Sequence, residues 1–205
     1  GEDERSRSKT TPREALNDLR QALTLAPPHL SLYQLTLEPN TLFYADPPTL
    51  PDEDNMAEME QALLTTLAQA GYERYEISAY ARPGERCRHN LNYWQFGDYL
   101  GIGPGAHGKI TTRHGVTRRV KHRHPKRWLS ASTDSGFISS ERTLLKDDLI
   151  FEFMLNALRL TDGVPLALFE QRTGVPRHMI NDTLQKTVEE GLLADQPQQL
   201  IATPL

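Results

Sequence analysis

The pattern of apolar and polar positions in the first eighty residues predicts two helices and two strands in alternation. A helix begins near Thr11, where threonine caps, proline takes the first turn and glutamate stands three residues after the cap. Apolar residues follow at helical spacing until Pro27. Residues 30–37 (LSLYQLTL) and 72–81 (YERYEISAYA) predict strands, and residues 52–70 predict a second helix. This order is an α/β crossover organisation, which predicts a mainly parallel sheet.

The C-terminal third changes to shorter helical segments. Residues 144–160 form the strongest predicted helix, and shorter helices are expected at 165–172 and 176–190. Residues 192–201 carry two apolar pairs separated by a polar turn, which predicts a two-stranded ribbon. Because helices followed by such a ribbon are typical of a winged helix, we expect a small, helical, winged-helix-like domain at residues 143–205.

The segments outside these predicted helices and strands set the limits of the first domain. Residues 1–10 (GEDERSRSKT) contain no apolar side chain, and we expect them to be disordered. Residues 82–108 are rich in aromatic residues and glycine without a clear period, residues 116–122 could form a strand, and residues 130–140 resemble a polar linker. The first large domain should therefore span residues 11–142.

The bulk composition narrows the class of protein without setting its function. A chain of 205 residues with 38% hydrophobic residues can bury a core, and a net charge of −4 gives no overall attraction to nucleic acid. The single cysteine excludes an internal disulfide and a cysteine-only metal cluster, which fits a reducing, cytoplasmic setting. No targeting leader is recognisable, and no apolar run approaches the ~20 residues that span a bilayer. We expect a soluble cytoplasmic protein.

The most chemically suggestive segment is residues 87–94 (CRHNLNYW). Imidazole is an axial ligand of heme iron, so His89 could bind the metal of a tetrapyrrole. Tyr93 and Trp94 follow four and five residues later and offer flat apolar surface to a macrocycle. The competing interpretation is a loop with core aromatics and a histidine that caps a backbone group, which is the commoner role of such residues.

Polar side chains around His89 extend the tetrapyrrole hypothesis. Asn90 and Asn92 supply hydrogen-bonding amides. Arg86 and Arg88 carry guanidinium groups, which match the geometry of propionate carboxylates. The segment thus combines an iron ligand, aromatic surface and propionate partners, and we assign no catalytic residue.

Residues 101–108 (GIGPGAHG) form a glycine-rich turn with two competing meanings. Glycine lets a backbone approach a ligand closely, but it equally permits a tight turn between strands. The spacing from Gly103 matches a phosphate-binding P-loop by chance, because Ile110 stands where serine or threonine must bind magnesium and Pro104 lacks an N–H donor. A dinucleotide site is rejected because no βαβ unit with a following acid surrounds the turn.

Local charge is uneven. Residues 109–127 hold eight Lys or Arg and no acid. Such a run could contact nucleic acid, anionic lipid or a carboxylate-bearing ligand, although a solvated face is its commonest meaning. Residues 145–205 instead carry five basic and nine acidic residues. The predicted winged helix therefore lacks the positive charge that DNA binding needs, and we expect a lid or docking module.

Three segments together resemble a known family. Residues 27–43 (PPHLSLYQLTLEPNTLF), residues 73–109 (ERYEISAYARPGERCRHNLNYWQFGDYLGIGPGAHGK) and the C-terminal helical module resemble the HemW family of radical-SAM heme chaperones. The motif His-Asn-x-x-Tyr-Trp at residues 89–94 separates this family from the true coproporphyrinogen oxidases. The resemblance implies an α/β fold, the C-terminal part of a partial TIM-like (β/α) barrel followed by a winged-helix-like domain. It also implies heme binding by His89, Asn90, Tyr93, Trp94 and Arg88.

The resemblance also concerns cofactors. The family uses S-adenosyl-L-methionine and a 4Fe-4S cluster that is bound by a CxxxCxxC motif in the N-terminal half of its barrel. This chain has only Cys87, so it resembles a C-terminal half without the cluster ligands. Thr36 and His107 fall where radical-SAM relatives line the S-adenosylmethionine pocket. The implied function is to bind heme and deliver it to a respiratory acceptor protein, without turnover by this chain.

Two other functions compete with the heme chaperone. The chain could be part of an oxygen-independent coproporphyrinogen III dehydrogenase, which would use the same cluster and cofactor. It could also be a nucleic-acid-binding module that uses the basic run and the winged helix. We expect no nucleic-acid partner because of the acidic C-terminal domain, whereas a transient contact with a membrane surface is compatible with the basic run.

Overall fold

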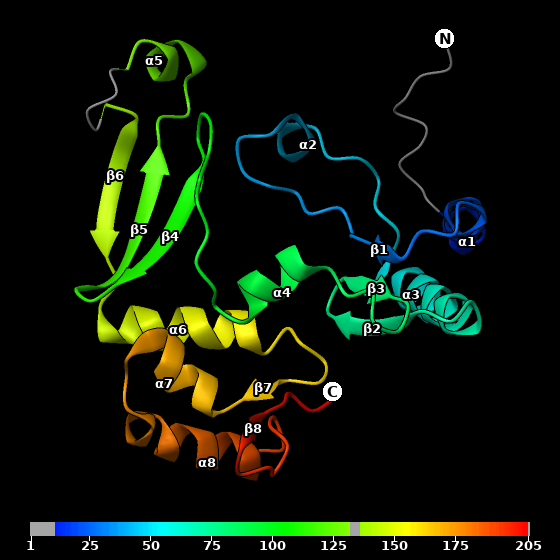
Figure 1. Cartoon of the computed structure of the whole chain (residues 1–205). Helices are drawn as coiled ribbons and strands as arrows, with labels where there is room; N and C mark the ends of the chain where they lie inside the picture. The colour runs from blue at the N-terminus through cyan, green and yellow to red at the C-terminus, as the bar shows by residue number, and fades with distance from the viewer. Residues whose placement is uncertain (1–10, 132–135, 205) are drawn as a thin grey trace. The chain divides into compact units, whose positions relative to one another are not determined.

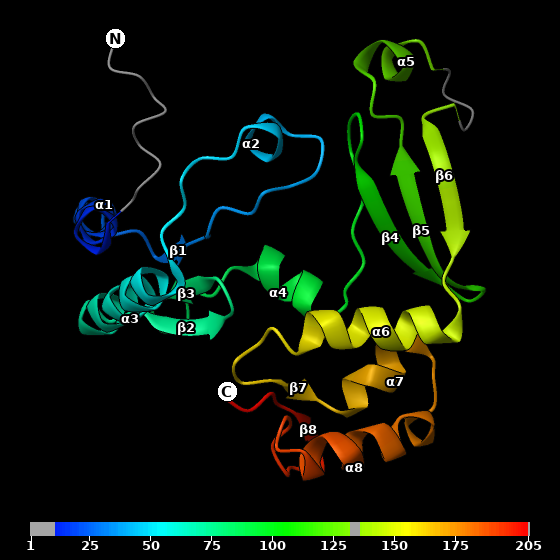
Figure 2. The same ribbon diagram turned by 180° about the vertical axis from the view of Figure 1, so that it is seen from behind.

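The computed structural model describes residues 11–131 and 136–204. They fall into two compact units that divide after Cys87 and are described separately. Figure 1 shows the elements along the chain, and Figure 2 shows the same ribbon from behind. Residues 1–10, which the sequence predicts to be disordered, lie outside the described residues. No helix within the described ranges is long and apolar enough to cross a membrane.

Two amphipathic helices of the first unit confirm the helical pattern. Helix α1 (Pro12–Thr24) begins at Thr11, whose backbone N–H donates to the Glu14 carboxylate at 2.8 Å while its hydroxyl accepts from the Glu14 N–H at 3.3 Å. Helix α3 (Glu53–Gln69) begins at Asp52, whose side chain caps the first turn. The two helices pack against each other (Figure 1). Their apolar faces share a core with the sheet, made by Leu19, Leu67, Tyr72 and Tyr80.

The small sheet of the first unit is antiparallel. It consists of β1 (His29–Ser31), β2 (Glu73–Glu76) and β3 (Ala79–Ala81) in the order β1-β3-β2. The prediction of a mainly parallel sheet is therefore wrong for the described residues. The alternating segment 72–81 is a hairpin instead of one strand, because the chain reverses after Glu76, where Arg74 Nη2 donates to the Ile77 carbonyl at 2.7 Å.

The first predicted strand is shorter than its apolar pattern. Of residues 30–37, only those in β1 pair with a neighbouring strand in the described chain. A short helix, α2 (Leu42–Ala45), follows and begins at Thr41, whose hydroxyl accepts from the Tyr44 N–H at 3.2 Å. Four residues are too few to display a helical period, so the pattern does not predict it.

The second unit begins with a helix and a second antiparallel sheet. Helix α4 (Arg88–Trp94) is followed by β4 (His107–Thr112), β5 (Gly115–Lys121) and β6 (Ile138–Thr143), in the order β4-β5-β6. Strand β5 confirms the strand expected at 116–122. The linker expected at 130–140 is wrong at its end, where residues from Ile138 onward pair with β5. A short helix, α5 (Pro125–Leu129), lies between β5 and β6.

The C-terminal part of this unit has the helix and strand order of a winged helix. Helix α6 (Lys146–Ala157) leads to β7 (Val164–Pro165), α7 (Ala167–Thr173), a single 3-10 turn at Arg177–Met179 and α8 (Asn181–Glu189). The last strand, β8 (Gln199–Leu200), pairs with β7. Buried aromatic rings lie at the middle of this core. The Phe153 ring makes edge contacts with two others, with centroid distances of 5.9 Å to Phe96 and 5.3 Å to Phe169. The predicted helical, winged-helix-like module is therefore present, although the domain limits at residues 142 and 143 stay a prediction.

Candidate functional site

Helix α4 carries the His-Asn-x-x-Tyr-Trp motif, although this segment of the sequence shows no clear helical periodicity. The helix is followed by a sharp turn in which Phe96 adopts a positive φ of 54°. A Cβ on Gly97 would lie 2.0 Å from Asn92 Oδ1, so only glycine fits there. Asn92 Nδ2 donates to the Asp98 carbonyl at 2.9 Å. Asn92 therefore holds the turn together, and its amide is engaged before any ligand arrives.

His89 lies at the exposed end of a row of aromatic rings. Its imidazole is exposed and meets the Tyr93 ring edge-on, with centroids 4.8 Å apart and planes at 72°. Tyr93 in turn contacts Tyr99 at 4.4 Å and Trp94 at 6.5 Å. An accessible imidazole can ligate the iron of a flat macrocycle, and the adjacent aromatic rings offer apolar surface to it.

Trp94 is fixed by a cation from the C-terminal module. The guanidinium carbon of Arg159 lies 4.3 Å from the Trp94 ring centroid, which is cation–π contact. The indole Nε1 of Trp94 is buried and has no hydrogen-bond acceptor within the described residues. Because an unsatisfied buried donor is costly, a carboxylate or other acceptor of a ligand would stabilise it.

The two remaining predicted heme residues lie on the same helix. Arg88 is its first residue and is exposed, and Asn90 is half-buried. The motif thus presents an accessible imidazole, two half-buried aromatic rings and a guanidinium on one short helix, beside a buried indole N–H that has no acceptor among the described residues. These groups match the iron, the macrocycle and the propionates of heme, so the residues present fit that group.

A buried ion pair anchors the turn behind the motif. The Lys109 side chain is 1% exposed, its Nζ lies 2.9 Å from Asp98 Oδ1, and it sits 4.1 Å from the Phe96 ring centroid. Asp98 also accepts from the Thr111 N–H and hydroxyl, each at 2.8 Å. Burial opposes ionisation of Asp98, but the bonds from Thr111 and Lys109 outweigh it and lower the pKa of this carboxyl. Lys109 belongs to the basic run, so a solvated face is the wrong interpretation for this residue.

The glycine-rich turn at 101–108 folds closely on its own backbone. A Cβ on Gly101 would lie 2.4 Å from the His107 carbonyl oxygen, and one on Gly108 would lie 3.2 Å from the Gly101 nitrogen. The tight-turn interpretation therefore explains these two glycines. Next to the turn, a pocket of about 280 Å³ is lined by Gly101, Gly108 and the aliphatic and basic side chains of Ile110, Arg119 and Lys121.

The two residues predicted to face S-adenosylmethionine lie in different units of the chain. Thr36 is exposed in the segment after β1 of the first unit, and His107 is exposed at the start of β4 in the second unit. Both assignments stay predictions. No group of three or more His, Cys, Asp or Glu residues in the part of the chain that the structure describes could hold a metal ion. A 4Fe-4S cluster needs thiolate ligands that one cysteine does not supply, so this chain does not fit that group.

Four residues that local sequence patterns do not identify are connected to the motif. Tyr99 contacts Tyr93, Arg159 contacts Trp94, and Glu152 binds Arg118, which contacts the Tyr99 hydroxyl. Arg118 lies on β5 and Glu152 on α6, whereas Tyr99 precedes β4 and Arg159 follows α6. No periodic signal could have identified them, because Glu152 lies 34 residues from Arg118 along the chain.

The chain is similar to proteins of one family. Residues 144–205 match the model of the HemN C-terminal domain. The chain is 46% identical over 183 residues to the heme chaperone HemW of Escherichia coli, covering 89% of this chain and 47% of that protein. It is also 41% identical over 158 residues to the mitochondrial radical S-adenosyl methionine domain-containing protein 1 of Mus musculus, covering 73% of this chain and 36% of that protein.

A solved structure is similar in fold. The radical-SAM coproporphyrinogen III oxidase HemN of Escherichia coli superimposes with a TM-score of 0.69 over 96% of this chain and 49% of that one, at 19% sequence identity. This likeness shows the fold alone, and it supports the predicted TIM-like barrel part followed by a C-terminal domain. The chain spans about half the length of the curated relatives it matches. On these matches, the chain belongs to the HemW family, and its residues 144–205 match the HemN C-terminal domain.

Proposed function

We propose that this chain is the heme-binding part of a heme chaperone, with His89 as the axial ligand of the iron. The observation that carries the proposal is the exposed imidazole in edge contact with Tyr93, on a helix that also presents Trp94. The name of the Escherichia coli relative, heme chaperone HemW, supports heme as the molecule that is bound. Heme bound here supplies an iron centre whose open coordination position the imidazole fills.

The other motif residues take complementary roles in this proposal. Tyr93 and Trp94 give the macrocycle apolar surface, and the exposed Arg88 pairs with a propionate. The unsatisfied Trp94 Nε1–H can donate a hydrogen bond to a polar group of the ligand, and Asn90 lies one residue from the iron ligand. Because His89 and Arg88 are exposed, the residues that would hold heme lie at the surface, which suits a protein that passes its ligand on.

Transfer is the second part of the proposal. The heme acceptor is a respiratory protein, reached from the cytoplasm with transient contact at a membrane surface, where the exposed basic residues near α5 are attracted to anionic headgroups. S-adenosylmethionine and the 4Fe-4S cluster belong to the longer proteins of the family, with Thr36 and His107 on the S-adenosylmethionine side. We propose no enzymatic step for this chain.

Nucleic-acid binding is disfavoured by the charge of the helix that would enter the groove. In α8 the cation Lys186 lies 3.7 Å from Glu190, and Asp182 and Glu189 flank it. A recognition helix needs uncompensated positive charge to neutralise phosphates. The module is therefore better suited to contact protein than DNA.

Titration with hemin tests the heme assignment. The chain should develop the intense near-ultraviolet absorbance band of bound heme, and His89→Ala should lose the signature of histidine ligation. His178→Ala, an exposed histidine of the C-terminal module, is the matched control and should titrate like the parent. Unchanged ligation in His89→Ala would show that another residue binds the iron.

A further inference from the structure

One face of the β4-β5-β6 sheet carries three cations in a row. Lys109, Arg118 and Arg142 are direct cross-strand partners on β4, β5 and β6. Like charges directly opposite each other destabilise a sheet, so each needs a nearby anion. We call these three residues the cation row.

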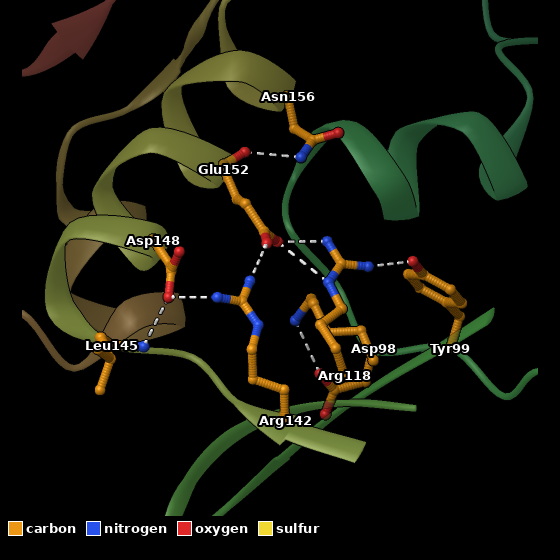
Figure 3. Close-up of polar contacts among 9 residues, drawn as sticks. Asp98, Tyr99, Arg118, Arg142, Leu145, Asp148, Glu152 and Asn156 are labelled. Atoms are coloured by element: carbon orange, nitrogen blue, oxygen red, sulfur yellow. Dashed lines mark hydrogen bonds and ion pairs between the residues drawn. The ribbon is translucent and has the colours of Figure 1, made fainter. Parts of the chain in front are cut away.

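Each cation of the row has a carboxylate partner. Lys109 Nζ lies 2.9 Å from Asp98, and Arg142 Nη1 lies 2.9 Å from Asp148. Arg118 donates from Nε to Glu152 Oε2 at 3.0 Å and from Nη2 to the same oxygen. Figure 3 shows the Glu152 carboxylate between the two guanidinium groups, and Arg142 Nη2 lies 3.9 Å from its other oxygen. Glu152 is therefore the anion that lets two facing arginines coexist.

The row is connected to the heme motif through Tyr99. The second terminal nitrogen of Arg118, Nη1, donates to the Tyr99 hydroxyl on the side away from Glu152 (Figure 3). The backbone of Tyr99 pairs with Lys109 at 2.9 and 3.0 Å, so its ring is held at both ends. That ring lies 4.4 Å from Tyr93, which contacts His89. A continuous set of contacts thus joins α6 of the C-terminal module to the imidazole.

We propose that Glu152 is a positioning residue for the heme site, acting through Arg118 and Tyr99 on Tyr93 and His89. Without the carboxylate, Arg118 and Arg142 repel each other, and Arg118 no longer has a fixed direction from which to hold the Tyr99 hydroxyl. The Tyr99 ring then loses one of its two anchors, and the imidazole loses a defined orientation. The C-terminal module in this way acts on heme ligation without touching heme. The inference rests on the proposed heme function and deepens it.

Hemin binding by substituted forms of the whole chain tests this proposal. Glu152→Gln keeps the size of the side chain and removes its charge, and Tyr99→Phe keeps the ring and removes the hydroxyl. Each should weaken hemin binding by about three- to tenfold and shift the absorbance and electron paramagnetic resonance signature of the ferric iron towards mixed ligation. Glu141→Gln is the matched control, because Glu141 pairs with Arg119 on the opposite face of the same sheet.

The outcomes separate a positioning role from a merely structural one. If both substitutions act through one path, the double variant should bind hemin about as well as the weaker single variant, because effects along one path do not add. Unchanged affinity and spectrum in Glu152→Gln, fully additive effects, or an equal effect of Glu141→Gln would each overturn the proposal. If Glu152→Gln does not fold, Tyr99→Phe and Arg118→Lys carry the same test, since Lys keeps the charge and loses the two-sided donation.

Failure of this proposal differs from failure of the heme function. If His89→Ala loses histidine ligation while Glu152→Gln is normal, the heme site stands and the positioning role is wrong. If the parent chain shows no histidine-ligated heme, the heme function itself is wrong and Glu152 has nothing to position.

Discussion

The two halves of the basic run, residues 109–119 and 120–127, each hold four Lys or Arg, but the environments of these side chains differ. In the first half, Lys109, Arg118 and Arg119 each lie against a carboxylate, and Lys109 is almost completely buried. In the second half, Arg123 and the α5 residues Lys126 and Arg127 are exposed. The difference arises because the strands of the first half face acids from other segments, whereas α5 lies at the end of the sheet. Three cations of the first half are therefore paired with acids, whereas Arg123, Lys126 and Arg127 of the second half are placed to attract an anionic surface.

Replacing the buried cation should give the largest effect. Lys109→Ala removes the aliphatic stem that covers Phe96 and leaves Asp98 without its cation, so we expect a loss of about 2–3 kcal/mol in the free energy of unfolding. The value lies below that of a fully buried pair because the Asp98 side chain is 38% exposed. Urea denaturation measures it, and Lys126→Ala serves as the control from the exposed half. Equal losses in both variants would erase the distinction between the halves.

Two adjacent arginines on β5 sharpen the comparison within the first half. Arg118 points to the Glu152 side and Arg119 to the opposite face, where its side chain is 52% exposed against 26% for Arg118. Arg118→Ala should cost about 1–2 kcal/mol and Arg119→Ala under about 0.5 kcal/mol, since exposed pairs contribute little. Thermal and urea unfolding of the two variants measure the difference. A reversed order would mean that the ion pair of Arg118 with Glu152 does not stabilise the unit.

The pH dependence of stability should report the Asp98 site. Burial raises the pKa of this carboxyl, but the hydrogen bonds from Thr111 and Lys109 prevail and leave it below its ordinary value. A depressed pKa in the folded state gives stability that is present above the unfolded pKa of about 3.9 and is lost as pH falls through the folded value. Asp98→Asn should therefore be less stable than the parent at pH 7, and the gap should narrow below about pH 4. Urea midpoints at pH 7 and pH 3 test this, and a constant gap would assign the stabilisation to packing instead of charge.

The sequence predicts those parts of the fold whose signals are local. The capping box of Thr11 and Glu14 and the apolar period that follows identify α1, and similar signals identify α3 and α6. The antiparallel sheets are not predicted, because β1 and β3 have three residues each and strand direction depends on a partner elsewhere in the chain. Helix α4, with seven residues, is too short for a periodic signal.

In the candidate site, too, only the residues with local sequence signals are predictable. Residue chemistry, strengthened by the family resemblance, identifies His89, Tyr93 and Trp94, and the structure brings their rings together. The residues that hold those rings are invisible to local patterns, because Arg118 and Glu152 meet only when β5 packs near α6. Charge counting also cannot separate Lys109 from Lys126, since burial depends on the acid that the fold places opposite.

Substitutions in the exposed second half should have the smallest effect on the free energy of unfolding. An unchanged stability there would show that these cations do not serve the fold. Lys126→Gln together with Arg127→Gln removes two cations from the last turn of α5, where they can stabilise the helix end by a few tenths of a kcal/mol each. We therefore expect a change of less than about 0.5 kcal/mol in unfolding free energy, together with weaker and less salt-dependent sedimentation with anionic lipid vesicles. Arg119→Gln, on the sheet and paired with Glu141, is the control for loss of one charge from the first half. If the α5 variant unfolds easily while vesicle binding is unchanged, the exposed half serves the fold and the comparison of the two halves fails.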